Sequence, residues 1–110
     1  MTTILIRKTG KNEYNSFVCM GHAGYAKRNK PDILCAAISV LVTNTINSLE
    51  ALAGEKMKVQ TNEETGFISC EFQSSLKAES TFLLDSMVFG LQTLSRDYGE
   101  KYLKVNFEEV

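Results

Sequence analysis

The sequence predicts a single α+β domain spanning residues 1–110, in which a mostly antiparallel sheet carries two helices. Three observations predict this fold. First, short segments of β-branched or alternating residues lie in two pairs, and turn residues separate the members of each pair. Second, a long helical pattern follows each pair. Third, one more strand-like segment closes the chain. The expected order of elements is therefore β-β-α-β-β-α-β.

The first two predicted strands form a hairpin at residues 2–8 and 13–20, joined by a turn that contains glycine. Side chains alternate between the two faces of a strand. The second strand should therefore turn Tyr14 away from Phe17 and Cys19.

The first predicted helix spans residues 33–53 and holds the most apolar stretch of the chain. Asp32 is a suitable N-cap because its carboxylate can accept the unpaired amide hydrogens of the first turn. Gly54 is the expected stop. Residues 33–42 are apolar on nearly all sides, which predicts burial against several neighbours.

The second half of the chain repeats the strand-strand-helix pattern loosely. Gly90 stands inside its helical segment at a cost of about 1 kcal/mol relative to alanine, which predicts close packing there. The expected elements are strands at 55–60 and 66–73, a helix at 77–97 that Ser74 and Ser75 introduce, and a strand at 101–107 before an acidic tail.

Composition and charge narrow the classes of function. A formal net charge of -1 argues against binding nucleic acid through bulk charge. The longest nearly apolar run, residues 33–42, is about half of the ~20 residues that span a bilayer. Three cysteines exclude a complete disulfide framework, and no signal peptide is visible. We expect a cytoplasmic protein with no membrane or direct nucleic-acid partner.

A cysteine at the start of the apolar helix and a histidine upstream of it suggest thiol chemistry. Cys35 would be the third helical residue, where unpaired amides and the helix dipole favour the reactive thiolate. His22, the only histidine, follows the second strand and is a natural base for that thiol. The alternatives are a small buried cysteine and a histidine that contributes one structural hydrogen bond.

Two polar neighbours are candidate supporting residues. Asp32 either caps the helix only or orients His22 as a third catalytic group. Ser39 lies one helical turn after Cys35, so its hydroxyl either donates to a thiolate or bonds its own helix backbone.

A polar loop without periodicity separates the histidine from the cysteine. Its basic residues form either a solvated tip or a lid that attracts an acidic or ribosome-associated partner. Glycine and asparagine tolerate positive φ and are candidate hinges. The predicted substrate-covering loop comprises Gly24, Tyr25, Lys27, Arg28, Asn29, Lys30 and Pro31.

No cofactor or metal site is expected. One histidine and three cysteines could supply four zinc ligands, but the chain has no Cys-x-x-Cys pair. Cys19 and Cys70 lie in predicted strands and are better interpreted as core residues.

The motifs GHA at 21–23 and DILCAAIS at 32–39 closely resemble the signature of the bacterial ribosomal-processing cysteine protease family, Prp. The similarity extends over essentially the full length and includes FLLDSMVFGLQTLSRDYGEKYLKV at 82–105. Members more often carry glycine where Asn29 stands, and they usually lack a proline at the position of Pro31.

The resemblance implies an α+β homodimer with a catalytic dyad of His22 and Cys35. It also implies a substrate, the N-terminal extension of the twenty-seventh large-subunit ribosomal protein, and a mobile loop that covers the bound peptide. The alternative from another class is a non-catalytic ribosome-assembly module that uses Lys27, Arg28 and Lys30 as its contact surface.

Overall fold

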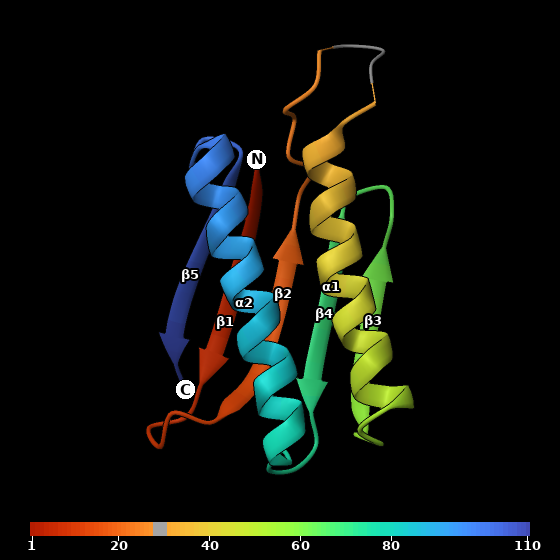
Figure 1. Ribbon diagram of the computed structural model, residues 1–110, viewed down its shortest axis with the longest axis vertical. Helices are drawn as coiled ribbons and strands as arrows, with labels where there is room; N and C mark the ends of the chain where they lie inside the picture. The colour runs from red at the N-terminus through yellow and green to blue at the C-terminus, as the bar shows by residue number, and fades with distance from the viewer. Residues whose placement is uncertain (28–30) are drawn as a thin grey trace.

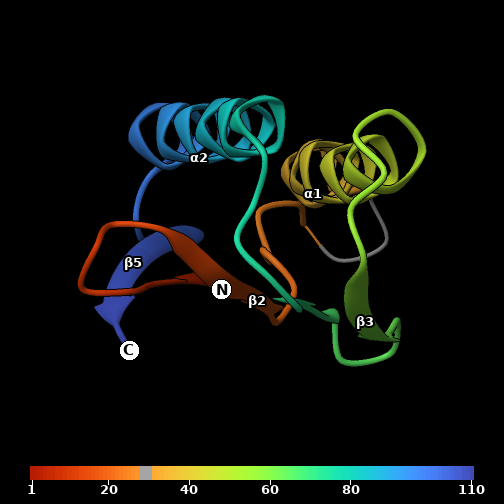
Figure 2. The ribbon, with the colours of Figure 1, turned by 90° about the horizontal axis from the view of Figure 1, so that it is seen from below.

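A computed structural model describes residues 1–27 and 31–110, which form a five-stranded sheet with two helices on one face (Figures 1 and 2). The order β-β-α-β-β-α-β is confirmed. The elements are β1 (Thr2–Lys8), β2 (Tyr14–Met20), α1 (Ile33–Ala51), β3 (Met57–Asn62), β4 (Phe67–Phe72), α2 (Ala78–Tyr98) and β5 (Leu103–Glu109).

The strands lie in the order β3-β4-β2-β1-β5. Among the strands that the structure describes, three neighbouring pairs are antiparallel and the pair of β1 and β5 is parallel, with α2 preceding the strand that returns beside β1. The sheet is therefore mostly antiparallel, as predicted. Because β2 pairs with β4, the end of β2 lies beside the β3–β4 turn (Figure 1).

The core lies between the sheet and the two helices. Ile4, Ile6 and Phe17 contribute fully buried side chains from the sheet. The buried side chains of α1 recur at helical spacing, so the helix packs on the core with one face. These buried side chains are Leu34, Ile38, Val42, Thr45, Ile46 and Leu49. The predicted burial of residues 33–42 against several neighbours is wrong, because Ile33 and Val40 are exposed.

The two helices pack closely where Gly90 of α2 faces Leu41 of α1. A Cβ atom at Gly90 would come within 3.1 Å of Leu41 Cδ1, so the glycine permits the contact. Close packing at this glycine is confirmed. By length and hydropathy α1 would be long enough to cross a membrane, a property it shares with core helices of soluble proteins.

The predicted alternation of β2 is wrong at Tyr14. Lys8 pairs with Tyr14 and Arg7 with Ser16, so Asn15 is an extra residue in the ladder. This bulge turns Tyr14 to the helix side, where its hydroxyl donates to Asp85 Oδ1 at 2.6 Å. Periodicity alone does not reveal a bulge.

Two predicted boundaries around β3 and α2 are wrong because tertiary contacts decide them. Glu55 does not begin a strand: its amide donates to Leu49 O at 2.9 Å and its carboxylate accepts from the Ser80 hydroxyl. Ser74 and Ser75 do not cap α2, whose N-cap is Lys77.

The acidic C-terminal tail belongs to a strand. Glu108 and Glu109 pair with Arg7 and Lys8 of β1, and Glu108 forms an ion pair with Arg7 at 3.5 Å. The strand therefore begins at Leu103 and extends two residues beyond the predicted end at 107.

Candidate active site

Three segments meet at one end of the molecule: the end of β2, the start of α1 and the β3–β4 turn (Figure 1). β2 brings His22 to this end, and α1 begins there with Ile33. The sheet order places the β3–β4 turn beside them. The predicted site between the end of β2 and the start of α1 therefore also includes the β3–β4 turn, which lies far away in the sequence.

His22 and Cys35 face each other at this junction. His22 Nδ1 lies 3.9 Å from Cys35 Sγ. The imidazole is exposed, while the cysteine is half-buried at the third position of α1. Proton transfer between this thiol and this base requires only that Sγ and Nδ1 move slightly closer together.

Asp32 is the N-cap of α1, as predicted. Its Oδ1 accepts from Cys35 N at 2.9 Å, and its Oδ2 accepts from Tyr25 N at 2.9 Å and Ala26 N at 3.5 Å. Burial acts to raise the pKa of this carboxyl, but the backbone donors outweigh it and lower the pKa. Both oxygens serve the backbone, so the carboxylate ties the start of the loop to the helix.

The group that contacts the other side of the imidazole comes from the β3–β4 turn. His22 Nε2 lies 2.9 Å from the carbonyl oxygen of Glu64. Residue types did not reveal this contact, because every residue has a carbonyl. Asn62 and Gly66 marked the turn, but not its proximity to His22.

A groove of about 450 Å³ runs from the dyad along α1 and the β3–β4 hairpin. Ser39 lies on its wall one turn beyond Cys35 and is exposed. The wall combines apolar side chains with small hydroxyls. It includes His22, Cys35, Ile38, Ser39, Val42, Thr43, Thr61, Asn62, Glu63, Phe67 and Ile68.

The described part of the predicted covering loop is anchored at Tyr25. Its ring meets Tyr98 and Tyr102 edge-on, with centroids 5.0 and 5.1 Å apart. Gly24 has φ +66°, a left-handed conformation that glycine adopts readily. Lys27 and Pro31 are exposed. The predictions for Arg28, Asn29 and Lys30 lie outside the described residues.

The other two cysteines are core residues, as predicted. Cys19 is 5% exposed, and burial together with the neighbouring Cys35 raises the pKa of its thiol to about 11. Burial and Glu71 raise the pKa of Cys70 to about 12. Within the described residues, no group of three or more His, Cys, Asp and Glu side chains is arranged to hold a metal ion.

The family model for cysteine protease Prp matches residues 1–104. The chain belongs to the Prp cysteine protease family. It is 30% identical over 102 residues to the ribosomal processing cysteine protease Prp of Bacillus subtilis, covering 89% of this chain and 90% of that protein. It is 22% identical to the Prp of Staphylococcus aureus, covering 98% and 100%.

Solved Prp structures share this fold. The S. aureus enzyme with a covalently linked product peptide has a TM-score of 0.89 at 21% identity, covering 98% of this chain and all of that chain (100%). A Streptococcus mutans protein has a TM-score of 0.86 at 23% identity, covering 100% and 96%. Membership of the family makes the chain a cysteine peptidase, so the enzyme is favoured over the non-catalytic assembly module.

Proposed function

We propose that this cysteine peptidase removes the N-terminal extension of the twenty-seventh large-subunit ribosomal protein, with Cys35 as nucleophile and His22 as base. The observation that carries the proposal is the 3.9 Å approach of His22 Nδ1 to Cys35 Sγ at the mouth of a groove. The relatives named ribosomal processing proteases support the substrate class.

The reaction follows from the two side chains. His22 Nδ1 takes the thiol proton, and the Cys35 thiolate attacks the carbonyl carbon of the scissile bond. The imidazolium then protonates the leaving amine as the carbon–nitrogen bond breaks, which leaves a thioester on Cys35. Water activated by His22 hydrolyses the thioester and restores the thiol.

The groove supports an extended, partly apolar peptide as the substrate. Its volume of about 450 Å³ lies in the range typical of ligand sites, roughly 300–1,000 Å³. Ile38, Val42 and Phe67 supply apolar surface, and Thr43 and Thr61 supply hydroxyls. These side chains suit a peptide segment that contains apolar and aromatic residues.

The loop between His22 and Asp32 is proposed to cover the bound peptide. Gly24 provides a backbone hinge, and Asp32 Oδ2 holds the amides of Tyr25 and Ala26. These bonds tie the start of the loop to the helix that carries Cys35. A movement of the loop would therefore affect the position of the nucleophile.

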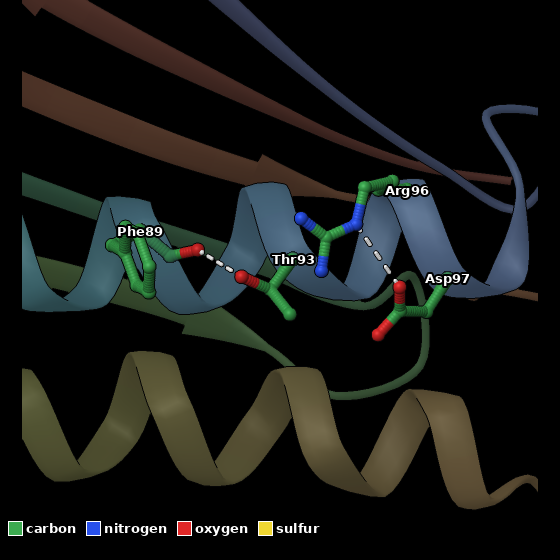
Figure 3. A network of polar contacts seen from close by, with 4 residues as sticks. All are labelled: Phe89, Thr93, Arg96 and Asp97. Atoms are coloured by element: carbon green, nitrogen blue, oxygen red, sulfur yellow. Dashed lines mark hydrogen bonds and ion pairs between the residues drawn. The ribbon is translucent and has the colours of Figure 1, made fainter.

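A homodimer is also part of the proposal. Exposed apolar side chains lie on the outer face of the helix pair, with Ile33 and Val40 on α1 and Phe82 and Phe89 on α2. Figure 3 shows that Thr93 and Arg96 on α2 make their contacts within the helix, to Phe89 O and Asp97. A second copy of the chain would bury this self-complementary apolar face.

The Phe89→Ser variant tests this dimer surface. It should halve the mass measured by light scattering, whereas an unchanged mass would place the dimer surface elsewhere.

A cytoplasmic location completes the proposal. Cys19, Cys35 and Cys70 are all free thiols, which fits a reducing compartment. A fractionation experiment that recovers the protein with a cytoplasmic marker would support it.

The cleavage of a synthetic peptide that carries the ribosomal-protein extension tests the function. Cys35→Ala should abolish cleavage without loss of the folded circular-dichroism spectrum. Cys70→Ala is the matched control, because Cys70 is fully buried in the core and should leave cleavage intact. Near-normal cleavage by Cys35→Ala would contradict the proposed nucleophile.

A further inference from the structure

We infer that the backbone carbonyl of Glu64 is the positioning group for His22, so that a peptide carbonyl orients the catalytic base. The inference rests on the proposed function of His22 and Cys35. It starts from the separation of 2.9 Å between His22 Nε2 and Glu64 O, on the side of the ring opposite Cys35.

The chemistry of the two ring nitrogens follows from this contact. A carbonyl oxygen only accepts hydrogen bonds, so Nε2 must carry a proton and donate it to Glu64 O. In the neutral imidazole Nδ1 then has a free lone pair, and Nδ1 is the nitrogen that faces Cys35 Sγ. The carbonyl therefore selects the tautomer that can accept the thiol proton.

The same bond assists the charged state of the base. When the proton moves from Sγ to Nδ1, the imidazole becomes an imidazolium and Nε2–H becomes a charge-assisted donor. The bond to Glu64 O strengthens at the moment when positive charge forms. A carbonyl dipole thus performs the orienting task that a carboxylate performs in Ser-His-Asp triads.

The carbonyl is held in place by the β3–β4 turn. Asn62 Oδ1 accepts from Glu64 N at 3.1 Å and from Thr65 N at 3.4 Å. Gly66 N donates to Glu63 O at 3.3 Å. These bonds fix the peptide units on both sides of the carbonyl.

The turn also packs directly against the strand end that carries the base. Gly66 has φ +67°, and a Cβ atom there would lie 2.6 Å from Gly21 O and 3.2 Å from His22 Cε1. Only glycine allows this approach, which brings the turn within hydrogen-bonding reach of the imidazole.

Asp32, the residue that the sequence offered for the orienting role, is occupied elsewhere. Its two oxygens accept from the amides of Cys35, Tyr25 and Ala26. The carboxylate therefore organises the helix start and the loop, and the turn at Glu64 organises the base.

Nitrogen NMR of the His22 ring tests the inference without measuring activity. The chain has one histidine, so its ring signals need no assignment. In Cys35→Ala protein at alkaline pH, where the imidazole is neutral, we expect the proton on Nε2 and none on Nδ1. A proton on Nδ1, or averaged signals from two exchanging tautomers, would overturn the inference.

Variants of Asn62 test the same point through kinetics. Asn62→Leu removes the acceptor that holds the turn and should lower kcat on the order of 10²-fold, more than it raises KM. Asn62→Asp keeps an acceptor oxygen and should restore most of kcat. Asn106→Leu, on the exposed part of β5, is the matched control.

Retention of normal kcat in Asn62→Leu, or an equal loss in Asn62→Asp, would overturn the positioning role. These results are separate from the fate of the proposed function. Cleavage by the Cys35→Ala variant would contradict the proposed dyad. An active wild-type enzyme whose His22 carries its proton on Nδ1 would contradict only the role of Glu64.

Discussion

The starts of the two helices occupy the same place in two successive strand-strand-helix units, yet only one is a candidate reactive centre. Cys35 and Ser80 are each the third residue of their helix. Cys35 Sγ faces a base and lines an open groove. Ser80 is fully buried, and its hydroxyl donates to the Glu55 carboxylate.

The difference shows that a helix N-terminus alone does not make a nucleophile. Both positions lie in the first turn of a helix, at the positive end of its dipole. A neighbouring base that can accept a proton, and room for a substrate, distinguish the first helix start from the second. Ser80 has a carboxylate partner and no access to solvent, so its hydroxyl stabilises the fold.

The largest expected effect comes from a comparison of His22, the partner of Cys35, with Glu55, the partner of Ser80. His22→Ala should lower kcat by roughly 10²- to 10⁴-fold, because general base catalysis typically contributes this much. Glu55→Gln, the equivalent change beside Ser80, should leave kcat near the wild-type value. Peptide cleavage followed by chromatography measures both, and equal losses would mean that the two helix starts do not differ in this way.

The next effect concerns stability at the second helix start. Ser80→Ala should lower the free energy of unfolding by about 1 to 2 kcal/mol, since a buried hydroxyl bonded to a carboxylate is lost. Activity should not change. Urea unfolding at neutral pH measures the loss, and a variant as stable as wild type would show that the bond contributes nothing.

This stability difference should depend on pH. The Ser80 hydrogen bond, together with Lys77, lowers the pKa of Glu55 below its ordinary value of 4.5. The stabilisation is therefore fully present above that value and is lost as the pH falls through the lower pKa of the folded protein. The wild-type advantage over Ser80→Ala should shrink in acid, whereas a gap that grows in acid would contradict the assigned charge state.

A smaller effect separates the two N-caps. Asp32→Ala should destabilise the protein by about 1 kcal/mol, because the side chain caps α1. Lys77 makes no capping bond from its side chain, whose ammonium instead donates to Ala53 O at 2.6 Å, so any loss in Lys77→Ala comes from that contact and not from a cap. Asp32→Asn retains an acceptor and should recover most of the loss. Thermal unfolding measures the Asp32 variants, and an Asp32→Asn variant as unstable as Asp32→Ala would contradict the capping role.

The sequence predicted the elements well because each pattern is local. Alternation, Asp32 before an apolar run and Gly54 after it depend on neighbouring residues only. The errors at Tyr14, Glu55 and Glu108 have one cause. A bulge, a bond to a distant serine and pairing with β1 each involve partners far away in the chain.

In the candidate site, too, the sequence predicts the local features and misses the contacts between distant segments. His22 and Cys35 were recognisable because their chemistry is rare and the chain has a single histidine. The role of Asp32 stayed open until its hydrogen bonds were known. The carbonyl of Glu64 was beyond prediction, since a backbone group has no residue signature and the strand order decides which turn meets β2.

Alkylation of Cys35 by iodoacetamide, followed site by site with mass spectrometry across a pH range, tests the dyad most directly. We expect selective labelling of Cys35 near neutral pH and slower labelling in His22→Ala. Cys19 and Cys70 should remain unreactive, because burial raises their pKa values to about 11 and about 12. Equal, sluggish labelling of all three cysteines, or no effect of His22→Ala on Cys35, would contradict a thiol activated by His22.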